Sequence, residues 1–373
     1  MSGTDARSAP APVPVLLACQ MLEGGGSEHQ MREMAMALDR SLFVPHVACF
    51  RNDAGRQDAL NARGIPVLEI PIRSFRSLGA FTGANLLRQY LRRHHIQVFH
   101  SFDTPFHCFG LPVARMAGVR VVLGSQRAHR SLYSAFYRRW LRFSDRFADG
   151  IVVNSETLRE HLVDDEGVPA RKIHLIHNGI NATRFRFRQR PHGATLTIGC
   201  VCRFRPEKDL PTLLRAFALL KQSSVRLLLV GGGPAQEALG DLARELGIAD
   251  RVEFRPVTLD VPAALGEIDI FVLPSLTEGL SNSLMEAMAR GCTVVASAVG
   301  GNLELVRPGV TGLLFPARDV RKLRDQMARL LDAPEEREQL AAAGAAWIRS
   351  NFSMEAAARS LEQLYRQTLS VGN

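Results

Sequence analysis

The sequence predicts an α/β fold made of two consecutive doubly wound domains, each a parallel sheet covered by helices. Strand-like and helix-like segments alternate along the whole chain, which is typical of parallel sheets. The length of 373 residues suits two domains of ordinary size. The pattern also restarts near residue 196, after an Arg-rich segment without clear periodicity at 182–193, which we interpret as the linker.

Each expected element follows from the spacing of its apolar residues. In the first half, apolar runs predict strands at residues 13–19, 44–50, 97–100, 119–124 and 150–154. Helical spacing predicts helices at residues 28–38, 84–94 and 131–147. In the second half, strands are expected at 196–201, 226–230, 252–254, 270–273 and 293–297. The helices there are expected at 210–220, 235–246, 261–265 and 283–290.

These elements predict a disordered Ala/Pro-rich tail at 1–12 and two Rossmann-like domains at 13–185 and 186–373. A last helix at about 355–370 is expected to pack back on the first domain. Open parallel sheets bind ligands at the carboxyl ends of their strands, so two facing sheets would hold a ligand in an interdomain cleft.

Composition predicts a packed globular protein. Apolar residues make up 46% and charged residues 22% of the chain. No run of eighteen apolar residues occurs, so no transmembrane helix is expected. The N-terminus is unlike a signal peptide, because Asp5 and Arg7 are charged and Pro10, Pro12 and Pro14 interrupt its apolar stretch. We therefore expect a cytoplasmic protein.

Six scattered cysteines are expected to be buried and reduced. They are Cys19, Cys49, Cys108, Cys200, Cys202 and Cys292. Their spacing, without a second Cys pair or a suitably spaced His, does not predict a zinc site. The net charge of +9 lies in the first half, where residues 1–190 hold 26 Lys and Arg against 16 Asp and Glu. Such an excess suits an anionic membrane surface, nucleic acid or a phosphorylated acceptor, or is an ordinary soluble surface.

Two glycine-rich segments follow expected strands. The first covers residues 23–28, where glycines would let the backbone approach a ligand and the amides of a helix start would attract phosphate. It is not a dinucleotide fingerprint, because His29 stands where the third glycine belongs. The second covers residues 230–234 and would allow close approach to a nucleotide. Tight turns are the alternative for both.

Cations follow the expected strand at 196–201. Arg203, Arg205 and Lys208 lie in a loop with Pro206, a combination that suits a diphosphate. Arg can bind phosphate oxygens bidentately, whereas Lys acts as a point charge. The alternative is a solvated charged loop.

Two glutamates eight positions apart form the most specific pattern. Glu278 precedes an expected helix, and Glu286 lies on it inside an otherwise apolar run. The free amides at residues 279–283 suit phosphate or sugar oxygens. Because an unpaired carboxylate in an apolar run is costly, a pair of ligand hydroxyls is a plausible partner for Glu286. An exposed helical Glu is the alternative.

The chain resembles glycosyltransferase family 4, whose members have the GT-B fold. The resemblance spans nearly the whole chain, and the glutamate pair Glu278 and Glu286 is its most specific part. The other matching segments are residues 24–26, 177–180, 203–208, 299–304, 309–315 and 352–353.

The resemblance implies transfer of a sugar from a UDP- or GDP-sugar to a glycan or lipid-linked acceptor, with retention of anomeric configuration, in polysaccharide or cell-envelope glycan synthesis. It implies that the first domain binds the acceptor and the second the donor. Arg203 and Lys208 would hold the diphosphate, Glu278 would lie near the transferred sugar and Glu286 would bind the ribose. The other expected donor-binding residues are Gly25, Gly26, Gly231, Gly279, Leu280, Ser281 and Asn282.

No metal and no further cofactor are expected. The chain contains no Asp-x-Asp, the motif that typically holds the metal in the other large glycosyltransferase fold. Arg203 and Lys208 would then neutralise the charge that a divalent cation would otherwise neutralise.

Two departures from the family pattern leave questions open. Arg255 and Pro256 stand where many members carry a glycine near the nucleobase, so the base is undetermined. Many members also have a His near the end of the strand expected at 119–124, for which Arg127, His129 and His100 are alternatives. A nucleotide-sugar epimerase or pseudo-sugar coupling enzyme of the same fold, or a non-catalytic partner subunit, would share the general pattern.

An aromatic and Arg-rich helix is expected at 131–147, with four arginines around an apolar stripe. The stripe consists of Leu132, Phe136, Trp140, Phe143 and Phe147. Either the stripe packs in the domain core, or the helix docks on an anionic bilayer that carries a lipid-linked acceptor. The second alternative would place the protein at the inner face of the cell membrane.

Overall fold

The structure is a computed structural model that describes residues 11–22, 25–52, 57–72, 75, 78–188 and 195–371. It consists of two compact units, which we describe separately. Unit 1 comprises the chain up to Val153, Val168–Ile176 and Ala358–Asn373. Unit 2 comprises Asn154–Gly167 and His177–Ala357. The chain thus enters unit 2 at 153/154, returns to unit 1 at 167/168 and enters unit 2 again at 176/177, just after the last strand of unit 1. The sequence predicted a single boundary at 185/186.

Unit 1 contains a seven-stranded parallel sheet in the order β3-β2-β1-β4-β5-β6-β7. Its strands are β1 (Val13–Met21), β2 (Phe43–Arg51), β3 (Val67–Glu69), β4 (Val98–Ser101), β5 (Val121–Gln126), β6 (Gly150–Val153) and β7 (Ile173–Leu175). The strand order reverses between β1 and β4. The helices that connect β1 to β3 therefore lie on one face of the sheet and the helices that connect β3 to β6 lie on the other, as a doubly wound fold requires.

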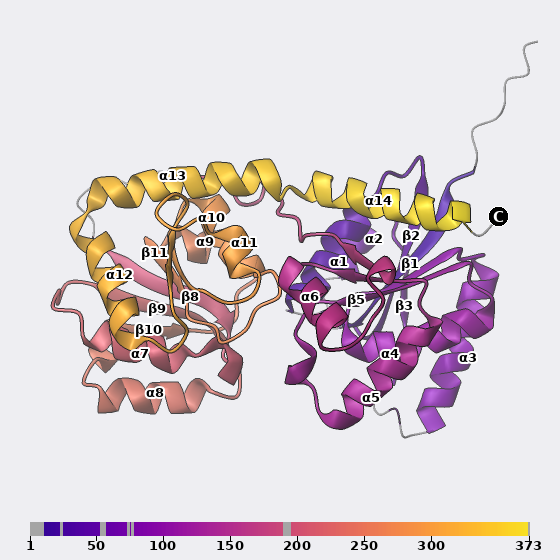
Figure 1. The fold of residues 1–373 in the computed structure, drawn as a ribbon, viewed down its shortest axis with the longest axis horizontal. Coiled ribbons are helices and arrows are strands. Elements are labelled where there is room, and N and C mark those ends of the chain that lie inside the picture. The colour runs from indigo at the N-terminus through magenta and orange to yellow at the C-terminus, as the bar shows by residue number, and fades with distance from the viewer. Residues whose placement is uncertain are drawn as a thin grey trace, which may run out of the picture. The chain divides into compact units, whose positions relative to one another are not determined.

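The helices of unit 1 cover both faces of this sheet. In Figure 1, α1 and α2 lie on one face, and α3, α4 and α5 lie on the other. Their bounds are α1 (Gly26–Ala37), α2 (Gln57–Asn61), α3 (Leu78–Arg93), α4 (Thr104–Ala117) and α5 (Ala135–Ser144). Most of α14 (Met354–Val371) also belongs to unit 1. There Tyr365 is buried against Phe43, and its hydroxyl lies 2.8 Å from His100 Nδ1.

Unit 2 contains a six-stranded parallel sheet in the order β10-β9-β8-β11-β12-β13. Its strands are β8 (Thr197–Arg203), β9 (Arg226–Gly232), β10 (Val252–Arg255), β11 (Ile270–Leu273), β12 (Thr293–Ser297) and β13 (Leu313–Phe315). Its helices are α6 (Glu156–Asp164), α7 (Leu210–Ala218), α8 (Gln236–Glu245), α9 (Val261–Gly266), α10 (Asn282–Arg290), α11 (Asn302–Leu305), α12 (Val320–Asp332) and α13 (Pro334–Asn351). The strand order reverses between β8 and β11, and α7 and α10 lie on opposite faces (Figure 1).

The core of each unit is formed by strands that are apolar on both faces. Residues 15–19 of β1 and all of β11 are buried. Continuous burial is expected for parallel strands with helices on both sides. This arrangement confirms the predicted pair of doubly wound α/β domains.

The predicted helix at 131–147 differs from the structure in length and in burial. Only Ala135–Ser144 is α-helical, between 3₁₀ turns at Arg130–Leu132 and Asp145–Phe147. The first alternative, a stripe packed in the core, is wrong, because Leu132, Phe136 and Trp140 are exposed. The residues of α5 that are buried are instead Leu141 and Ser144.

Candidate functional site

The carboxyl ends of β8 and β11 meet at the point where the strand order of unit 2 reverses. Arg203 is the last residue of β8, and the loop at residues 274–281 follows β11. Because the helices after these two strands leave toward opposite faces, the strand ends stay uncovered by them. Ligands of open α/β sheets bind at this position.

Lys208 and Glu278 form an ion pair between these two loops. Lys208 ends a 3₁₀ turn at Pro206–Lys208, and its Nζ donates to Glu278 Oε1 at 2.5 Å. Ser275 Oγ donates to the same carboxylate oxygen at 2.6 Å. The backbone N–H of Leu276 also donates to the carbonyl of Glu207 at 2.8 Å. The structure therefore brings together the predicted residues Lys208 and Glu278.

The surroundings of Lys208 keep it charged. Burial by itself would lower the pKa of this amine, but the carboxylate of Glu278 and the thiol of Cys202 raise it, and the net pKa lies above its usual value. A carboxylate that accepts two short hydrogen bonds also holds the ammonium group in a defined direction.

Arg203 differs from Lys208 in having an exposed side chain. Its guanidinium makes no hydrogen bond or ion pair with the part of the chain that the structure describes. Arg205 is also exposed and lies 3.8 Å from the carboxylate of Glu207. Arg203 therefore offers a guanidinium that can pair with an anion without first breaking a contact.

The glycines of the second glycine-rich segment are required by contacts within the protein. Gly231 has φ of +151°, and a Cβ there would lie 1.9 Å from the carbonyl oxygen of Cys202. Gly233 has the same φ, and its Cβ would lie 2.6 Å from the carbonyl oxygen of Phe204. Close packing between the carboxyl ends of β8 and β9 and the residues that follow them explains both glycines. Contact of Gly231 with a donor remains a prediction.

A second pair of glycines supports the loop that carries Glu278. Gly300 has φ of +49°, and a Cβ there would lie 2.0 Å from the carbonyl oxygen of Glu278. A Cβ at Gly301 would lie 1.9 Å from the carbonyl oxygen of Gly279, which accepts a hydrogen bond from Gly301 N–H at 2.8 Å. Residues 300–301 thus fix the backbone at residues 278–279.

The start of α10 is held by side chains. Ser281 is its N-cap, and Ser281 Oγ accepts from Leu284 N–H at 3.4 Å. Asn178 is buried and donates from Nδ2 to the carbonyl of Leu280 at 3.0 Å and to Asn282 Oδ1 at 2.7 Å. We did not predict a site role for Asn178. The only signal was its place in the segment 177–180 that carries the family resemblance.

Glu286 lies on α10 and is only 9% exposed. Its neighbours Leu284, Met285, Ala287 and Met288 are also buried. The alternative of an exposed helical glutamate is therefore wrong. A buried carboxylate needs polar partners, as expected for a ligand-binding group.

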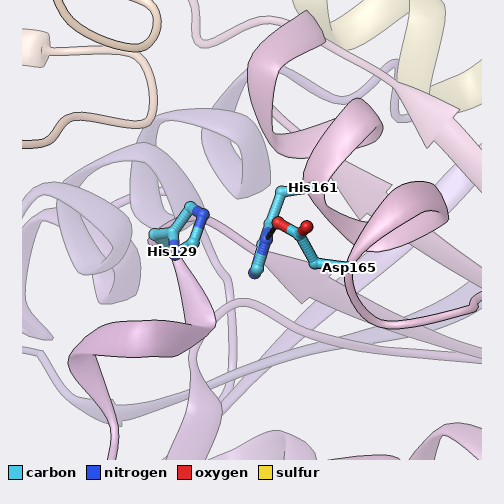
Figure 2. A group of neighbouring side chains, drawn as sticks. All are labelled: His129, His161 and Asp165. Carbon is cyan, nitrogen blue, oxygen red and sulfur yellow. Dashed lines mark hydrogen bonds and ion pairs between the residues drawn. The ribbon is translucent and has the colours of Figure 1, made fainter.

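Two glutamates and two histidines form local polar contacts elsewhere in unit 2. Glu304 on α11 accepts from Glu156 N–H at 2.8 Å, and its other oxygen lies 2.9 Å from His177 Nε2. His161 on α6 lies 2.6 Å from Asp165, measured from Nδ1 to Oδ2, and the two side chains point toward one another in Figure 2. The contacts of Glu304 thus hold both the start of α6 and the segment after β7 against α11.

In unit 1, the first glycine-rich segment lies before α1. Glu23 and Gly24 lie outside the described residues, whereas Gly25 is the N-cap of α1 and Gly26 its first residue. A Cβ at Gly25 would lie 1.9 Å from Glu28 Oε2. The carboxylate of Glu28 is thus folded back beside Gly25, so a diphosphate arriving there would meet a like charge.

The three alternatives for a family histidine differ in their environments, and all lie in unit 1. His100 is buried, with Nδ1 2.8 Å from Tyr365 Oη and Nε2 2.8 Å from Ser125 Oγ. Burial and the charge of Arg127 keep the pKa of His100 well below its usual value. Both nitrogens are therefore used within the protein, which argues for a structural role.

Arg127 and His129 follow β5. The guanidinium of Arg127 lies 4.5 Å from the centre of the Phe102 ring, and burial lowers its pKa to about 10. His129 Nδ1 lies 2.7 Å from Ser131 Oγ, and this histidine is also drawn in Figure 2. Both side chains are half-buried just after the carboxyl end of β5, and both remain alternatives for the family histidine.

Comparison with known proteins identifies the family. Residues 24–184 match the model of "Glycosyltransferase Family 4", and residues 195–333 match that of "Glycosyl transferases group 1". The GDP-mannose-dependent alpha-(1-6)-phosphatidylinositol monomannoside mannosyltransferase of Mycobacterium tuberculosis is 30% identical over 332 residues, which are 83% of this chain and 85% of that protein. The D-inositol 3-phosphate glycosyltransferase of Thermobispora bispora is 32% identical over 249 residues, which are 60% and 56% of the two chains.

Two solved structures share the fold. Sucrose-phosphate synthase from Thermosynechococcus elongatus has a TM-score of 0.85 at 21% identity, covering 96% of this chain and 100% of that one. The Anabaena protein HepE, in complex with UDP-glucose, has a TM-score of 0.83 at 21% identity, covering 96% and 99%. With the match to the mycobacterial enzyme, these comparisons show that the chain belongs to glycosyltransferase family 4 and is a glycosyltransferase of GT-B fold.

Proposed function

We propose that this glycosyltransferase takes its sugar from a nucleoside diphosphate sugar bound at the carboxyl edge of the unit 2 sheet. The observation that carries the proposal is the Lys208–Glu278 pair beside the exposed Arg203, at the switch point between β8 and β11. Two cations at this position suit a diphosphate.

The proposed reaction breaks the bond between the anomeric carbon and the β-phosphate oxygen. An acceptor hydroxyl attacks the anomeric carbon from the same face, and its proton passes to the departing phosphate, so that the configuration is retained. Negative charge grows on the β-phosphate as this bond breaks. Preorganised cations stabilise that charge more in the transition state than in the ground state.

The contacts of Glu278 suggest that it acts through Lys208. Its carboxylate orients the ammonium group and keeps it protonated, while Glu286, buried on α10, accepts hydrogen bonds from the ribose hydroxyls. The start of α10, capped by Ser281, offers backbone amides to the sugar or the phosphate.

We propose GDP-mannose and inositol-containing lipid acceptors as the first substrates to test. The mycobacterial relative is named for GDP-mannose and a phosphatidylinositol mannoside, and the Thermobispora relative for an inositol phosphate. The donor and acceptor classes agree with the UDP- or GDP-sugar and the glycan or lipid-linked acceptor that the sequence predicts.

The test is a panel of nucleotide sugars. A bound donor raises the melting temperature by mass action, and turnover releases a nucleoside diphosphate. We expect at least one UDP- or GDP-sugar to stabilise the protein and to be consumed when an acceptor is added. NMR of the anomeric proton of the product would then report retention. Stabilisation by no nucleotide sugar, in a panel that covers both bases, would contradict the proposal.

Metal independence is a separate prediction. Because Arg203 and Lys208 would supply the positive charge at the diphosphate, we expect transfer to continue at an undiminished rate in excess EDTA. Activity that is lost on chelation and restored by Mn²⁺ would show that these two residues are insufficient.

A further inference from the structure

The outward face of α5 combines exposed aromatic rings with arginines. Phe136 is 57% exposed, and Trp140 and Phe143 are each 44% exposed. The ring centres of Phe136 and Trp140 are 6.3 Å apart, and those of Trp140 and Phe143 are 5.9 Å apart. We call Phe136, Tyr137, Trp140 and Phe143 the aromatic face of α5.

The aromatic face is not the product of a loosely attached helix. Leu141 is buried, and Ser144 Oγ and Trp140 Nε1 both donate to the carbonyl of Cys108 on α4, each at 3.2 Å. Ser134 caps the helix by accepting from Tyr137 N–H. The helix is thus fixed on the domain while its rings remain in water, which is unfavourable for a free surface.

The charges on α5 are all positive. Arg138, Arg139 and Arg142 lie on the helix, and residues 135–144 contain no Asp or Glu. After the helix, Arg146 follows Asp145, whose carboxylate is already paired with Arg130 at 2.9 Å and with His107 at 3.0 Å. Aromatic rings interleaved with arginines on a fixed helix match the boundary between anionic head groups and acyl chains. Trp and Tyr favour that boundary because each ring is apolar and carries one polar atom.

A second exposed apolar group lies at the start of α3. Leu78 is 84% exposed and Phe81 is 78% exposed. Both α3 and α5 pack against α4. The same layer of unit 1 therefore carries two sets of unburied apolar side chains.

We propose that the aromatic face of α5 docks on an anionic phospholipid surface. Charge complementarity selects this occupant, because the arginines beside the aromatic rings carry the charge that phosphodiester head groups attract. None of the helices that the structure describes is long and apolar enough to cross a membrane, so the proposed contact is interfacial. The proposal rests on unit 1 alone and is independent of the donor site.

The experiment uses Trp140 as the probe. The chain has two tryptophans, and Trp347 on α13 lies under the guanidinium of Arg307, 3.6 Å from it. In the Trp347→Phe variant, fluorescence reports Trp140 only. We expect vesicles of phosphatidylcholine and phosphatidylglycerol to shift its emission to the blue and brominated lipids to quench it, whereas pure phosphatidylcholine vesicles have much less effect.

Matched variants separate charge from ring insertion. Each arginine near an anionic surface contributes about a fivefold factor to partitioning, so Arg138→Gln, Arg139→Gln and Arg142→Gln together should weaken vesicle binding roughly a hundredfold. The control replaces three exposed cations of unit 2, Lys221, Arg321 and Lys322, by Gln and should change binding much less.

The apolar part has its own control. Phe136→Ser with Phe143→Ser should abolish the fluorescence shift, whereas Val257→Ser with Leu259→Ser, which are exposed in unit 2, should leave it intact. All four side chains are exposed, so circular dichroism should show folded variants. The proposal is overturned if brominated lipid fails to quench Trp140, or if the α5 variants bind vesicles like their controls. Self-association through α5 without lipid, lost in Phe136→Ser, would instead assign the face to a second copy.

Discussion

Lys208 is a cation whose direction is set by the protein. Ser275 donates a hydrogen bond to the carboxylate of Glu278. The same carboxylate accepts a hydrogen bond from the ammonium group of Lys208 and so orients it. Arg203 is different, because its exposed guanidinium has five donors available for a ligand. Together they would offer the diphosphate one preorganised charge and one adaptable charge.

The proposed roles predict large kinetic effects at both cations. Arg203→Ala and Lys208→Ala should each lower kcat by about 10²–10³, because one preorganised stabilising group is lost in the transition state. The double variant should be less than additive if both act on one phosphate. Steady-state kinetics with a saturating donor measures this.

Arg205→Ala is the matched control, since Arg205 is exposed in the same loop but lies near Glu207. We expect a smaller loss of kcat for this variant. Wild-type rates for the Arg203 and Lys208 variants would place the donor elsewhere.

Glu286 should contribute to donor affinity more than to chemistry. Loss of a charged acceptor from ribose hydroxyls costs roughly 1.5–3 kcal/mol, so Glu286→Ala should bind the nucleoside diphosphate at least about tenfold more weakly. Titration calorimetry measures this affinity directly. Unchanged affinity in a folded variant would show that the buried carboxylate serves the protein core instead.

At the scale of elements, glycines join the loops that carry the site. Gly231 and Gly233 allow the end of β9 and the residue after it to pack on residues 202–204. Gly300 and Gly301 allow the segment after β12 to pack on residues 278–279. The loop with Glu278 therefore depends on a neighbouring strand connection for its position.

Gly300→Ala tests this dependence. A Cβ at Gly300 would overlap the carbonyl of Glu278, and φ of +49° is unfavourable for alanine, so both stability and turnover should fall. Gly309→Ala is a matched control, because Gly309 has φ of +73° but no atom within 4 Å of the added Cβ.

We expect about 1 kcal/mol of destabilisation in each variant from backbone strain, and roughly 1–3 kcal/mol more in Gly300→Ala from overpacking. Chemical denaturation and kcat measure the two effects. Equal losses of unfolding free energy and of kcat in the two variants would mean that the loop carrying Glu278 accommodates the added Cβ without further destabilisation.

The sequence predicted most central strands because their apolar runs are unambiguous. The strands β11 and β12 have the predicted bounds, residues 270–273 and 293–297. It did not predict α4, whose Gly110 and Pro112 interrupt the helical pattern. The ring stripe of α5 was predicted from periodicity, but periodicity alone cannot say whether a stripe meets a core or a partner.

At the site, motifs and contacts differ in what a sequence can reveal. Lys208 and Glu278 are 70 positions apart, so from the sequence only the family resemblance predicted that they act together. In the structure they meet because β8 and β11 are neighbours in the sheet. Asn178 could not be assigned a role, because its partners Leu280 and Asn282 lie about a hundred residues further along the chain.

At the scale of the whole molecule, the basic excess lies mainly in the part of the chain that forms unit 1. Residues 1–190 carry ten more cations than anions, and the remainder has one more anion than cations. Such a distribution favours orientation of unit 1 toward anionic surfaces at low salt, and it weakens as ionic strength rises.

Buried histidines predict that unit 1 loses stability in acid. Burial, His94 and Arg40 lower the pKa of His46 from 6.5 to about 4. Between pH 6.5 and 4, the unfolded chain binds a proton at His46 more readily than the folded chain does. The stability that depends on a neutral His46 is therefore complete above pH 6.5 and is lost as the pH falls toward 4. The full loss corresponds to roughly 3 kcal/mol.

The variant His46→Gln removes this titration. Between pH 6.5 and 4, the unfolding free energy of the wild type should therefore fall more steeply than that of the variant, as measured by denaturant titration at each pH. Parallel curves for the two proteins would show that His46 protonates equally in both states.

The return of residues 358–373 to unit 1 has a consequence for synthesis of the chain. A ribosome releases the N-terminus first, and domains generally fold as they emerge. Unit 1 begins first but stays incomplete until Tyr365 can reach Phe43 and His100, whereas all of unit 2 precedes residue 358. The part of the protein that is translated first is therefore the last to finish folding, and a nascent chain that stalls before Tyr365 would leave His100 without one of its hydrogen-bond partners.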